Sequence, residues 1–220
     1  YIDDLRPMAG EVVVGFVGSP VAAGELQTVD TSAALAVPGV VGCFTAADVP
    51  GNNMFGVITH DEPFLADHQL LYRGQPIVLI AAETSAALAR ARQAVRVEFR
   101  EAKPILTVEQ SIRDQRFIGP LRKIARGDVN ATLARAANRL SGTFTSGGQE
   151  QFYLESQAAI AYPGELRQML VHSSTQNPTE IQALVAEMLG VGQHEVVCIC
   201  KRMGGAFGGK ESQAAIPAMM

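Results

Sequence analysis

Short apolar runs separated by polar turns dominate the first half of the chain. Such aliphatic runs are typical of strands, whereas the alanine-rich stretch 84–96 repeats its apolar positions at helical spacing. Residues 50–67 contain Gly51 and Pro63 and are predicted to form a long loop. The predicted strands of this part are 12–17, 40–44, 70–72, 76–81 and 95–99, and a short helix is predicted at 31–37.

The second half of the chain combines clear helix starts with further strands. Asp128 is a predicted N-cap for a helix over 129–137. Asn177 offers a second cap, followed by Pro178 at the first helical position and Glu180 at the third, so a longer helix is predicted to begin there. Strands are predicted at 139–144, 157–161, 169–172 and 195–200, and short helices at 108–113 and from 212 onward. This order predicts an α+β fold class, with a mixed α/β part in the second half.

Composition limits what the chain is expected to bind. Of its 220 residues 47% are hydrophobic and 18% are charged, which is typical of a folded domain and not of a disordered segment. The net charge of -4 comes without a basic stripe, so nucleic acid is not an expected partner. No apolar run approaches the roughly 20 residues of a membrane span and no signal peptide is visible, so we expect a cytoplasmic protein. Its three cysteines are interpreted as structural thiols in a reducing compartment.

A glycine-rich loop, residues 202–211, lies between a predicted strand and a predicted helix. Its glycines let backbone N–H groups approach a ligand closely, and the helix N-terminus behind it favours an anionic or oxo-type ligand. Gly204 to Lys210 fits the G-x-x-x-x-G-K pattern of a phosphate-binding loop, but Glu211 stands where that loop needs a hydroxyl group and would repel phosphate. A glycine-rich bend that only allows close packing remains an alternative interpretation.

A second unusual segment, residues 147–155, reads Gly-Gly-Gln-Glu-Gln-Phe-Tyr-Leu-Glu. Its glycines would present the Gln149 amide to a ligand oxygen, to which an amide donates a hydrogen bond without adding charge. Taken alone, the segment is more typical of a Gly-Gly turn that leads into an amphipathic strand. The functional interpretation therefore depends on the other motifs of the chain.

Three motifs together resemble the molybdenum hydroxylase family, in particular the molybdopterin-binding subunit of xanthine dehydrogenases. They are the segment 147–155, the Ser-Thr-Gln-Asn-Pro stretch 174–178 and the glycine-rich loop 202–211. The resemblance implies a small hammerhead-type α+β domain over 1–102, a linker over 103–126 and, over 127–220, the beginning of a mixed α/β molybdopterin-binding domain. Gln151 and Ala206 depart from the family pattern, which often has His and Gly at these positions.

The resemblance also implies roles for individual residues. Gln149 would hydrogen-bond an oxygen ligand of molybdenum, and the backbone N–H of Gly208 would meet the same region. Phe207 would pack beside the metal and shape the substrate approach. Glu211 would face a purine, whose ring nitrogens a carboxylate can bind, whereas aldehyde-oxidising relatives tend to carry an apolar residue there. Gln149 and Glu211 are thus the candidate catalytic residues, and the pterin dithiolene, not a protein side chain, would hold the metal.

As part of an intact subunit, the chain is expected to serve the oxidation of hypoxanthine or xanthine with oxygen derived from water. The resemblance implies molybdopterin as cofactor, and partners that carry iron–sulfur clusters and FAD on other subunits or domains of an oligomer. The chain begins without Met and stops inside a predicted helix, so we expect a truncated piece that is inactive alone, since the family's catalytic glutamate lies farther along. Two alternatives stay open: a non-catalytic fragment, and an aldehyde oxidase-type member of the same family.

Overall fold

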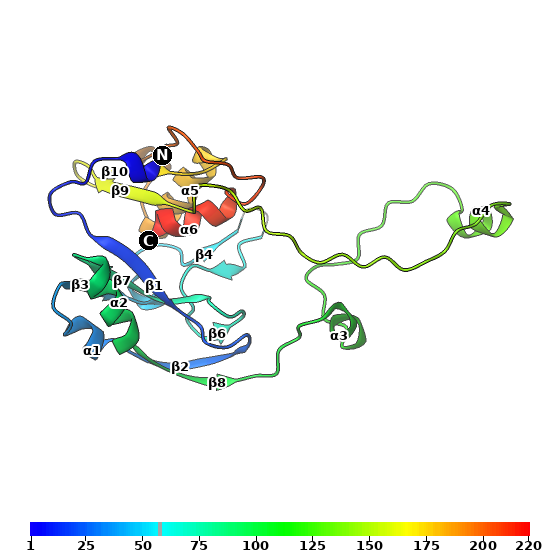
Figure 1. Cartoon of the computed structure of the whole chain (residues 1–220), viewed down its shortest axis with the longest axis horizontal. Coiled ribbons are helices and arrows are strands. Elements are labelled where there is room, and N and C mark those ends of the chain that lie inside the picture. Colours follow the sequence, from blue (N-terminus) through cyan, green and yellow to red (C-terminus); the bar gives the residue numbers. More distant parts are fainter. Residues whose placement is uncertain (57–58) are drawn as a thin grey trace. The chain divides into compact units, whose positions relative to one another are not determined.

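The computed structural model describes residues 1–56 and 59–220 of the chain. They divide into two compact units, one made of residues 1–103 with 151–220 and the other of residues 104–150. Figure 1 shows the sheets of the larger unit and the two short helices of the smaller one. None of the helices in these described residues is long and apolar enough to cross a membrane.

The first sheet of the larger unit is built around one buried strand. β7 (Pro76–Ala82) is almost wholly buried because its sequence is apolar on both faces, and it pairs antiparallel with β1 (Val13–Gly18) and with β3 (Val40–Phe44). Helix α2 (Ser85–Ala94) packs on this sheet through its alanine-rich face. These elements confirm the predicted strands and helix, while α1 (Ser32–Leu35) is shorter than predicted.

A second sheet has the strand order β6–β2–β8, with antiparallel pairs throughout. Its strands are β6 (Gln69–Leu70), β2 (Gly24–Asp30) and β8 (Arg96–Glu101). β2 was not predicted, because only Leu26 and Val29 are apolar in its largely polar sequence. Residues 50–67, predicted as one loop, contain the short pair β4 (Met54–Phe55) and β5 (Glu62–Pro63), and positions 57 and 58 of that loop lie outside the described residues.

The third sheet, of order β11–β10–β9, leads into the candidate site. β10 (Met169–Ser173) pairs in parallel with β11 (Val196–Ile199) and antiparallel with β9 (Ala159–Pro163). Parallel neighbours need a crossover connection, and helix α5 (Pro178–Leu189) supplies it. This helix begins at the predicted Asn177 cap, whose side chain accepts a backbone N–H at 3.3 Å. The cap therefore confirms the helix start that the sequence predicts.

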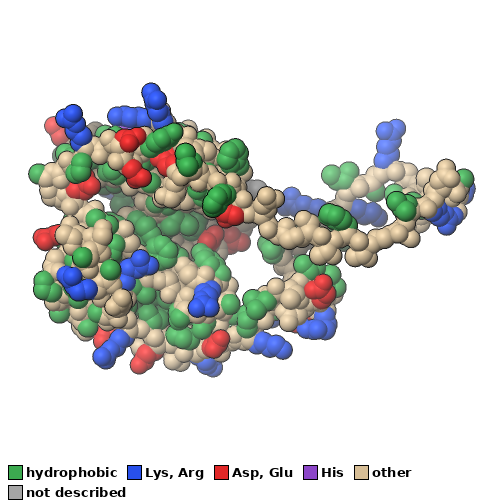
Figure 2. Space-filling view, viewed as in Figure 1, with side chains coloured by type: hydrophobic (Ala, Val, Ile, Leu, Met, Phe, Trp, Pro, Cys, Tyr) green, Lys and Arg blue, Asp and Glu red, His purple; other side chains and the backbone are tan. Residues whose placement is uncertain are grey.

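The two parts of the larger unit share one hydrophobic core. Phe55, Phe64, Leu65 and Leu79 of the first part belong to the same buried cluster as Val171, Ile181, Leu184 and Met219 of the second. The loop before β4 also bonds to the last turn of α5, because Gly51 donates its backbone N–H to the Met188 carbonyl at 2.8 Å. Figure 2 shows hydrophobic side chains gathered where the two parts meet. Residues 1–103 and 151–220 are thus held together by the packing of their side chains, in addition to the covalent connection through residues 104–150.

The smaller unit, residues 104–150, has little regular structure. It contains α3 (Val108–Arg113) and α4 (Val129–Arg135), and Asp128 caps α4 as predicted. None of its residues, all of which the structure describes, is buried. The strand predicted at 139–144 is wrong, since this unit has no second strand with which it could pair.

Candidate functional site

The glycine-rich loop runs from the end of β11 toward helix α6 (Ala215–Met219) and turns sharply on the way. Phe207 and Gly208 have positive φ values of 52° and 89°. Such a φ is ordinary for glycine but uncommon for a residue with a side chain, and the Phe207 side chain is 77% exposed. Close packing adds a second constraint, because a Cβ on Gly204 would lie 2.5 Å from the Cβ of Glu155. The conformation of the loop therefore depends both on residues that adopt positive φ and on the close packing of Gly204 against Glu155.

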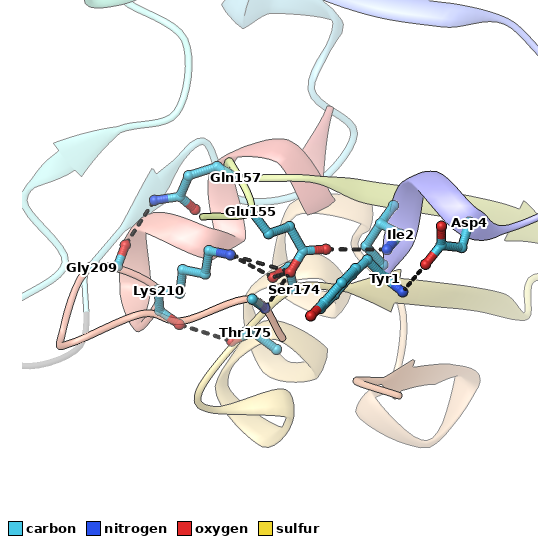
Figure 3. Close-up of polar contacts among 10 residues, drawn as sticks. Tyr1, Ile2, Asp4, Glu155, Gln157, Ser174, Thr175, Gly209 and Lys210 are labelled. Carbon is cyan, nitrogen blue, oxygen red and sulfur yellow. Dashed lines mark hydrogen bonds and ion pairs between the residues drawn. The ribbon is translucent and has the colours of Figure 1, made fainter. Parts of the chain in front are cut away.

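The centre of the site is a buried ion pair between this loop and the segment before β9 (Figure 3). Lys210 is fully buried, its Nζ lies 3.4 Å from Glu155 Oε2, and it donates to Ser174 Oγ at 2.7 Å. Ser174, directly after β10, donates in turn to Glu155 Oε2 at 2.7 Å. The ammonium also lies 4.6 Å from the ring centroid of Tyr153, which adds cation–π attraction. The charge of Lys210 is thus compensated inside the protein.

Glu155 collects hydrogen-bond donors from distant parts of the chain. Besides Lys210 and Ser174, its carboxylate accepts the backbone N–H of Gly204 at 2.8 Å and that of Ile2 at 3.1 Å. Burial acts to raise the pKa of this carboxyl, but its hydrogen bonds and the charge of Lys210 outweigh burial, so the pKa lies below its ordinary value. The carboxylate therefore stays ionised at neutral pH and ties the loop to the N-terminal residues.

The loop backbone is also bonded to the Ser-Thr-Gln-Asn stretch that follows β10. The N–H of Gln176 donates to the Lys210 carbonyl at 2.8 Å, and the N–H of Gly208 donates to the side-chain oxygen of Gln176 at 3.0 Å. Thr175 Oγ1 donates to the same Lys210 carbonyl at 3.2 Å. All three sequence motifs are therefore in contact in the structure, since Glu155 of the segment 147–155 also bonds to the loop and to Ser174.

The structure brings part of the predicted site together. Phe207, Gly208 and Glu211 all lie exposed on the loop. Lys210, directly before Glu211, is buried, so these neighbouring side chains face opposite ways. Gln149 belongs to the smaller unit, where it is exposed, and its place beside the loop stays a prediction.

The sequence did not predict roles for Gln176, Glu155 and Lys210. Each stands inside one of the three motifs, but no spacing along the chain indicates that these side chains meet. The buried Lys210 also settles the phosphate-loop alternative, because its ammonium is bound to Glu155 and Ser174 and does not reach the surface. A phosphate group would find no free lysine charge in this loop.

Gly208 lies beside open space, but its N–H, predicted to meet an oxygen of the cofactor, is bonded to the Gln176 side chain. A Cβ on Gly208 would meet nothing within 4 Å, and Gln176 adds an amide, which donates without charge. Among residues 1–56 and 59–220, no group of three or more His, Cys, Asp or Glu side chains is placed to hold a metal ion. Burial, with a smaller contribution from Cys200, raises the pKa of Cys198 to about 11, so this thiol stays protonated. The residues present thus offer one uncharged donor, the amide of Gln176, to an oxygen-bearing group.

Comparison with known proteins covers both parts of the chain. Residues 1–103 match the family described as the a/b hammerhead domain of aldehyde oxidase and xanthine dehydrogenase, and residues 111–220 match the molybdopterin cofactor-binding domain family. The xanthine dehydrogenase of Dictyostelium discoideum is 39% identical over 97% of this chain, and aldehyde oxidase 4 of Cavia porcellus is 37% identical over 98%. In both comparisons the chain spans 16% of the relative's own length.

A solved structure has the same arrangement of elements. The aldehyde oxidoreductase of Desulfovibrio gigas matches with a TM-score of 0.83 and 25% sequence identity, over 97% of this chain and 26% of that one. Together with the hammerhead match, this likeness confirms the predicted α+β fold class. The chain therefore belongs to the aldehyde oxidase and xanthine dehydrogenase family of molybdopterin-binding oxidoreductases.

Proposed function

We propose that this chain contributes one wall of the molybdenum site in an enzyme that oxidises a purine, hypoxanthine or xanthine, with oxygen derived from water. The observation that carries the proposal is the opposite orientation of Lys210 and Glu211. Because the buried ammonium is neutralised by Glu155, the exposed carboxylate of Glu211 is left free to meet a substrate. The likeness to proteins named xanthine dehydrogenase, at 39% identity, supports this substrate class.

The chain's own residues bind and orient, while molybdopterin, when bound, supplies the metal centre that takes up electrons. The N–H of Gly208 holds the side-chain oxygen of Gln176, which leaves the amide nitrogen of Gln176 to donate to an oxygen of the cofactor. Gln149 is proposed for a similar task from the smaller unit, as the family resemblance implies. The exposed ring of Phe207 would limit the directions from which a flat substrate approaches.

Glu211 is proposed to select the substrate. A carboxylate accepts a hydrogen bond from a ring N–H of a purine and so holds the ring in one orientation within the site. An aldehyde without such an N–H gains nothing from this group. A site that hydrogen-bonds one substrate class therefore discriminates against the other.

The remaining parts of the enzyme are proposed from the family. Electrons would pass to iron–sulfur clusters and FAD on other subunits or domains of a cytoplasmic oligomer. The catalytic base and further pterin-binding segments would lie outside these 220 residues, so we expect the chain alone to be inactive. Within the chain, we take residues 1–102 as the hammerhead-like domain, 103–126 as a linker and 127–220 as the beginning of the cofactor-binding domain.

Glu211→Val in the full-length subunit tests the substrate class. We expect kcat/KM for hypoxanthine to fall by about 10²-fold, because the hydrogen bond that orients the purine ring is lost. Molybdenum content and turnover of a simple aldehyde should not fall. Glu165→Val, at an exposed glutamate in the turn between β9 and β10, is the matched control. Unchanged purine turnover in Glu211→Val would instead favour an aldehyde oxidase-type enzyme.

The second candidate is a non-catalytic fragment. The observation that favours it is that the chain spans 16% of the length of its relatives. It is tested by measuring molybdenum and pterin in the purified chain of 220 residues. Stoichiometric molybdenum with pterin fluorescence would contradict the fragment hypothesis, whereas a chain that folds and takes up neither would support it.

A further inference from the structure

The buried pair of Glu155 and Lys210 joins parts of the chain that lie far apart in sequence (Figure 3). Glu155 accepts the backbone N–H of Ile2 at 3.1 Å and that of Gly204 at 2.8 Å. Lys210 donates to Ser174 Oγ at 2.7 Å, just after β10. The two charged residues are 8% and 0% exposed, so their interaction is barely screened by solvent. The N-terminal residues, the third sheet and the glycine-rich loop are thus tied to one charge pair.

A glycine-rich loop does not select a single conformation by itself. Gly205 and Gly208 adopt positive φ values of 89°, and glycine loses more conformational freedom on ordering than any other residue. The contacts that select the observed conformation must therefore come from other residues. The charge pair acts at both ends of the glycine stretch, because Glu155 accepts the N–H of Gly204 and Lys210 follows the last glycine directly.

We infer that Glu155 and Lys210 are positioning residues that select the conformation of the glycine-rich loop and so direct Gly208 and Glu211 toward the site. Anchoring Lys210 inward turns the next side chain, Glu211, outward. Anchoring Gly204 fixes where the turn toward Gly208 begins. Only the purpose of this positioning rests on the proposed function, since the selection of a loop conformation is a property of the chain itself.

The rival explanation is that the pair only adds stability. Replacing both members of a buried ion pair by uncharged groups often leaves stability unchanged, whereas removing one member leaves a buried charge without its partner. A double variant without either charge therefore separates the two explanations. If the pair positions the loop, the stability of the double variant recovers while the order of the loop does not.

The experiment uses the chain of 220 residues without cofactor. The variants are Glu155→Gln, Lys210→Met and the double variant, and Lys201→Met, at an exposed lysine near the start of the loop, is the matched control. Thermal unfolding gives the stability of each variant. Native-state amide exchange, measured by NMR, gives the order of the loop.

The informative amides are those of Gly208 and Gln176, because neither N–H is bonded to an altered side chain. Their exchange is compared with that of Val171, a fully buried residue of the core. In the double variant we expect both to exchange at least about tenfold faster relative to Val171, with a Tm closer to the parent than that of Glu155→Gln. Lys201→Met should leave the ratio unchanged. A parent-like ratio in the double variant would overturn the inference.

A milder variant covers the case in which the double variant does not fold. Ser174→Ala keeps both charges and removes the hydroxyl that bridges them. We expect a smaller rise of the same exchange ratio, and an unchanged ratio would overturn the inference here as well. These measurements need no purine oxidation, so a failure of the proposed function would appear in the Glu211→Val assay and not in the exchange data.

Discussion

Two glycine-rich segments of this chain differ in what surrounds them. A Cβ on Gly147 or Gly148 would meet nothing within 4 Å, and both glycines belong to a unit in which no residue is buried. A Cβ on Gly204 would lie 2.5 Å from the Cβ of Glu155, and hydrogen bonds tie the loop around it to two other segments. Glycine permits many conformations in both places, but only the second has contacts that choose among them.

This difference decides which roles predicted from the motifs can be related to the structure. The resemblance places Gln149 and Glu211 in one site. The loop that carries Glu211 is held by hydrogen bonds, because its partners lie in the same compact unit. Gln149 has no comparable support, since its side chain takes part in none of the hydrogen bonds found among the described residues. Its role depends on how the smaller unit docks, and that stays a prediction.

The largest effect is expected from breaking the charge pair. Glu155→Gln leaves Lys210 buried without its counter-charge, so we expect the free energy of unfolding to fall by about 3–5 kcal/mol. Urea denaturation of the chain measures it. Glu150→Gln, in the same motif but exposed and in the smaller unit, should change stability by no more than about 0.5 kcal/mol. Equal effects of the two substitutions would mean that the buried pairing of Glu155 adds no more stability than an exposed glutamate does.

A second test asks which glutamine serves the cofactor. Gln176 already contacts Gly208, so we expect Gln176→Ala in the full-length subunit to lower kcat by about 10²–10³-fold, as the loss of an aligned donor does. Gln149→Ala tests whether the smaller unit reaches the loop. A comparable loss would place Gln149 in the site, whereas a loss confined to Gln176→Ala would leave the role to Gln176. Molybdenum content of each variant separates lost chemistry from lost cofactor.

A third test compares the glycines themselves. Gly204→Ala places a methyl group against the Glu155 Cβ and backbone, so we expect a destabilisation of about 1–3 kcal/mol. Gly147→Ala enters open space and should leave stability unchanged within about 0.5 kcal/mol. Urea midpoints of the two variants give the comparison. A tolerated Gly204→Ala would show that the loop can shift away from Glu155 at little cost.

The sequence predicts those elements whose signals are local. The cap at Asn177 and the apolar runs of β7 and β10 identify helix and strands without knowledge of their partners. β2 was not predicted because its sequence is largely polar and its strand conformation depends on pairing with β6 and β8. The run 139–144 fails for the opposite reason, since it has strand-like residues and no partner.

The same limit applies to the candidate site. Phe207, Gly208 and Glu211 could be predicted because they are neighbours in one motif. The pairing of Glu155 with Lys210 could not, because charged residues this far apart in sequence are ordinarily solvated and only the fold shows that these two are buried. The role of Gln176 likewise depends on the approach of the loop to the end of β10.

The smallest effect is expected from pH. The pKa of Glu155 lies below its ordinary value of 4.5, so the unfolded chain takes up a proton at this group before the folded chain does. The stability that Glu155 contributes is therefore present above pH 4.5 and is lost as pH falls through the lower pKa of the folded state. The difference in unfolding free energy between the parent and Glu155→Gln should stay constant from about pH 7 to 5 and shrink below that.

Urea denaturation at each pH measures this difference, and Glu150→Gln serves as reference because its exposed carboxylate has no buried partner. A difference that persists undiminished to about pH 3 would mean that the loss in Glu155→Gln comes from packing and not from charge. The pH dependence therefore tests whether charge or packing accounts for the difference between the two glycine-rich segments. If charge is responsible, what separates the ordered loop from the exposed glycines is an ionised carboxylate in a buried place, and acid should make the two segments more alike.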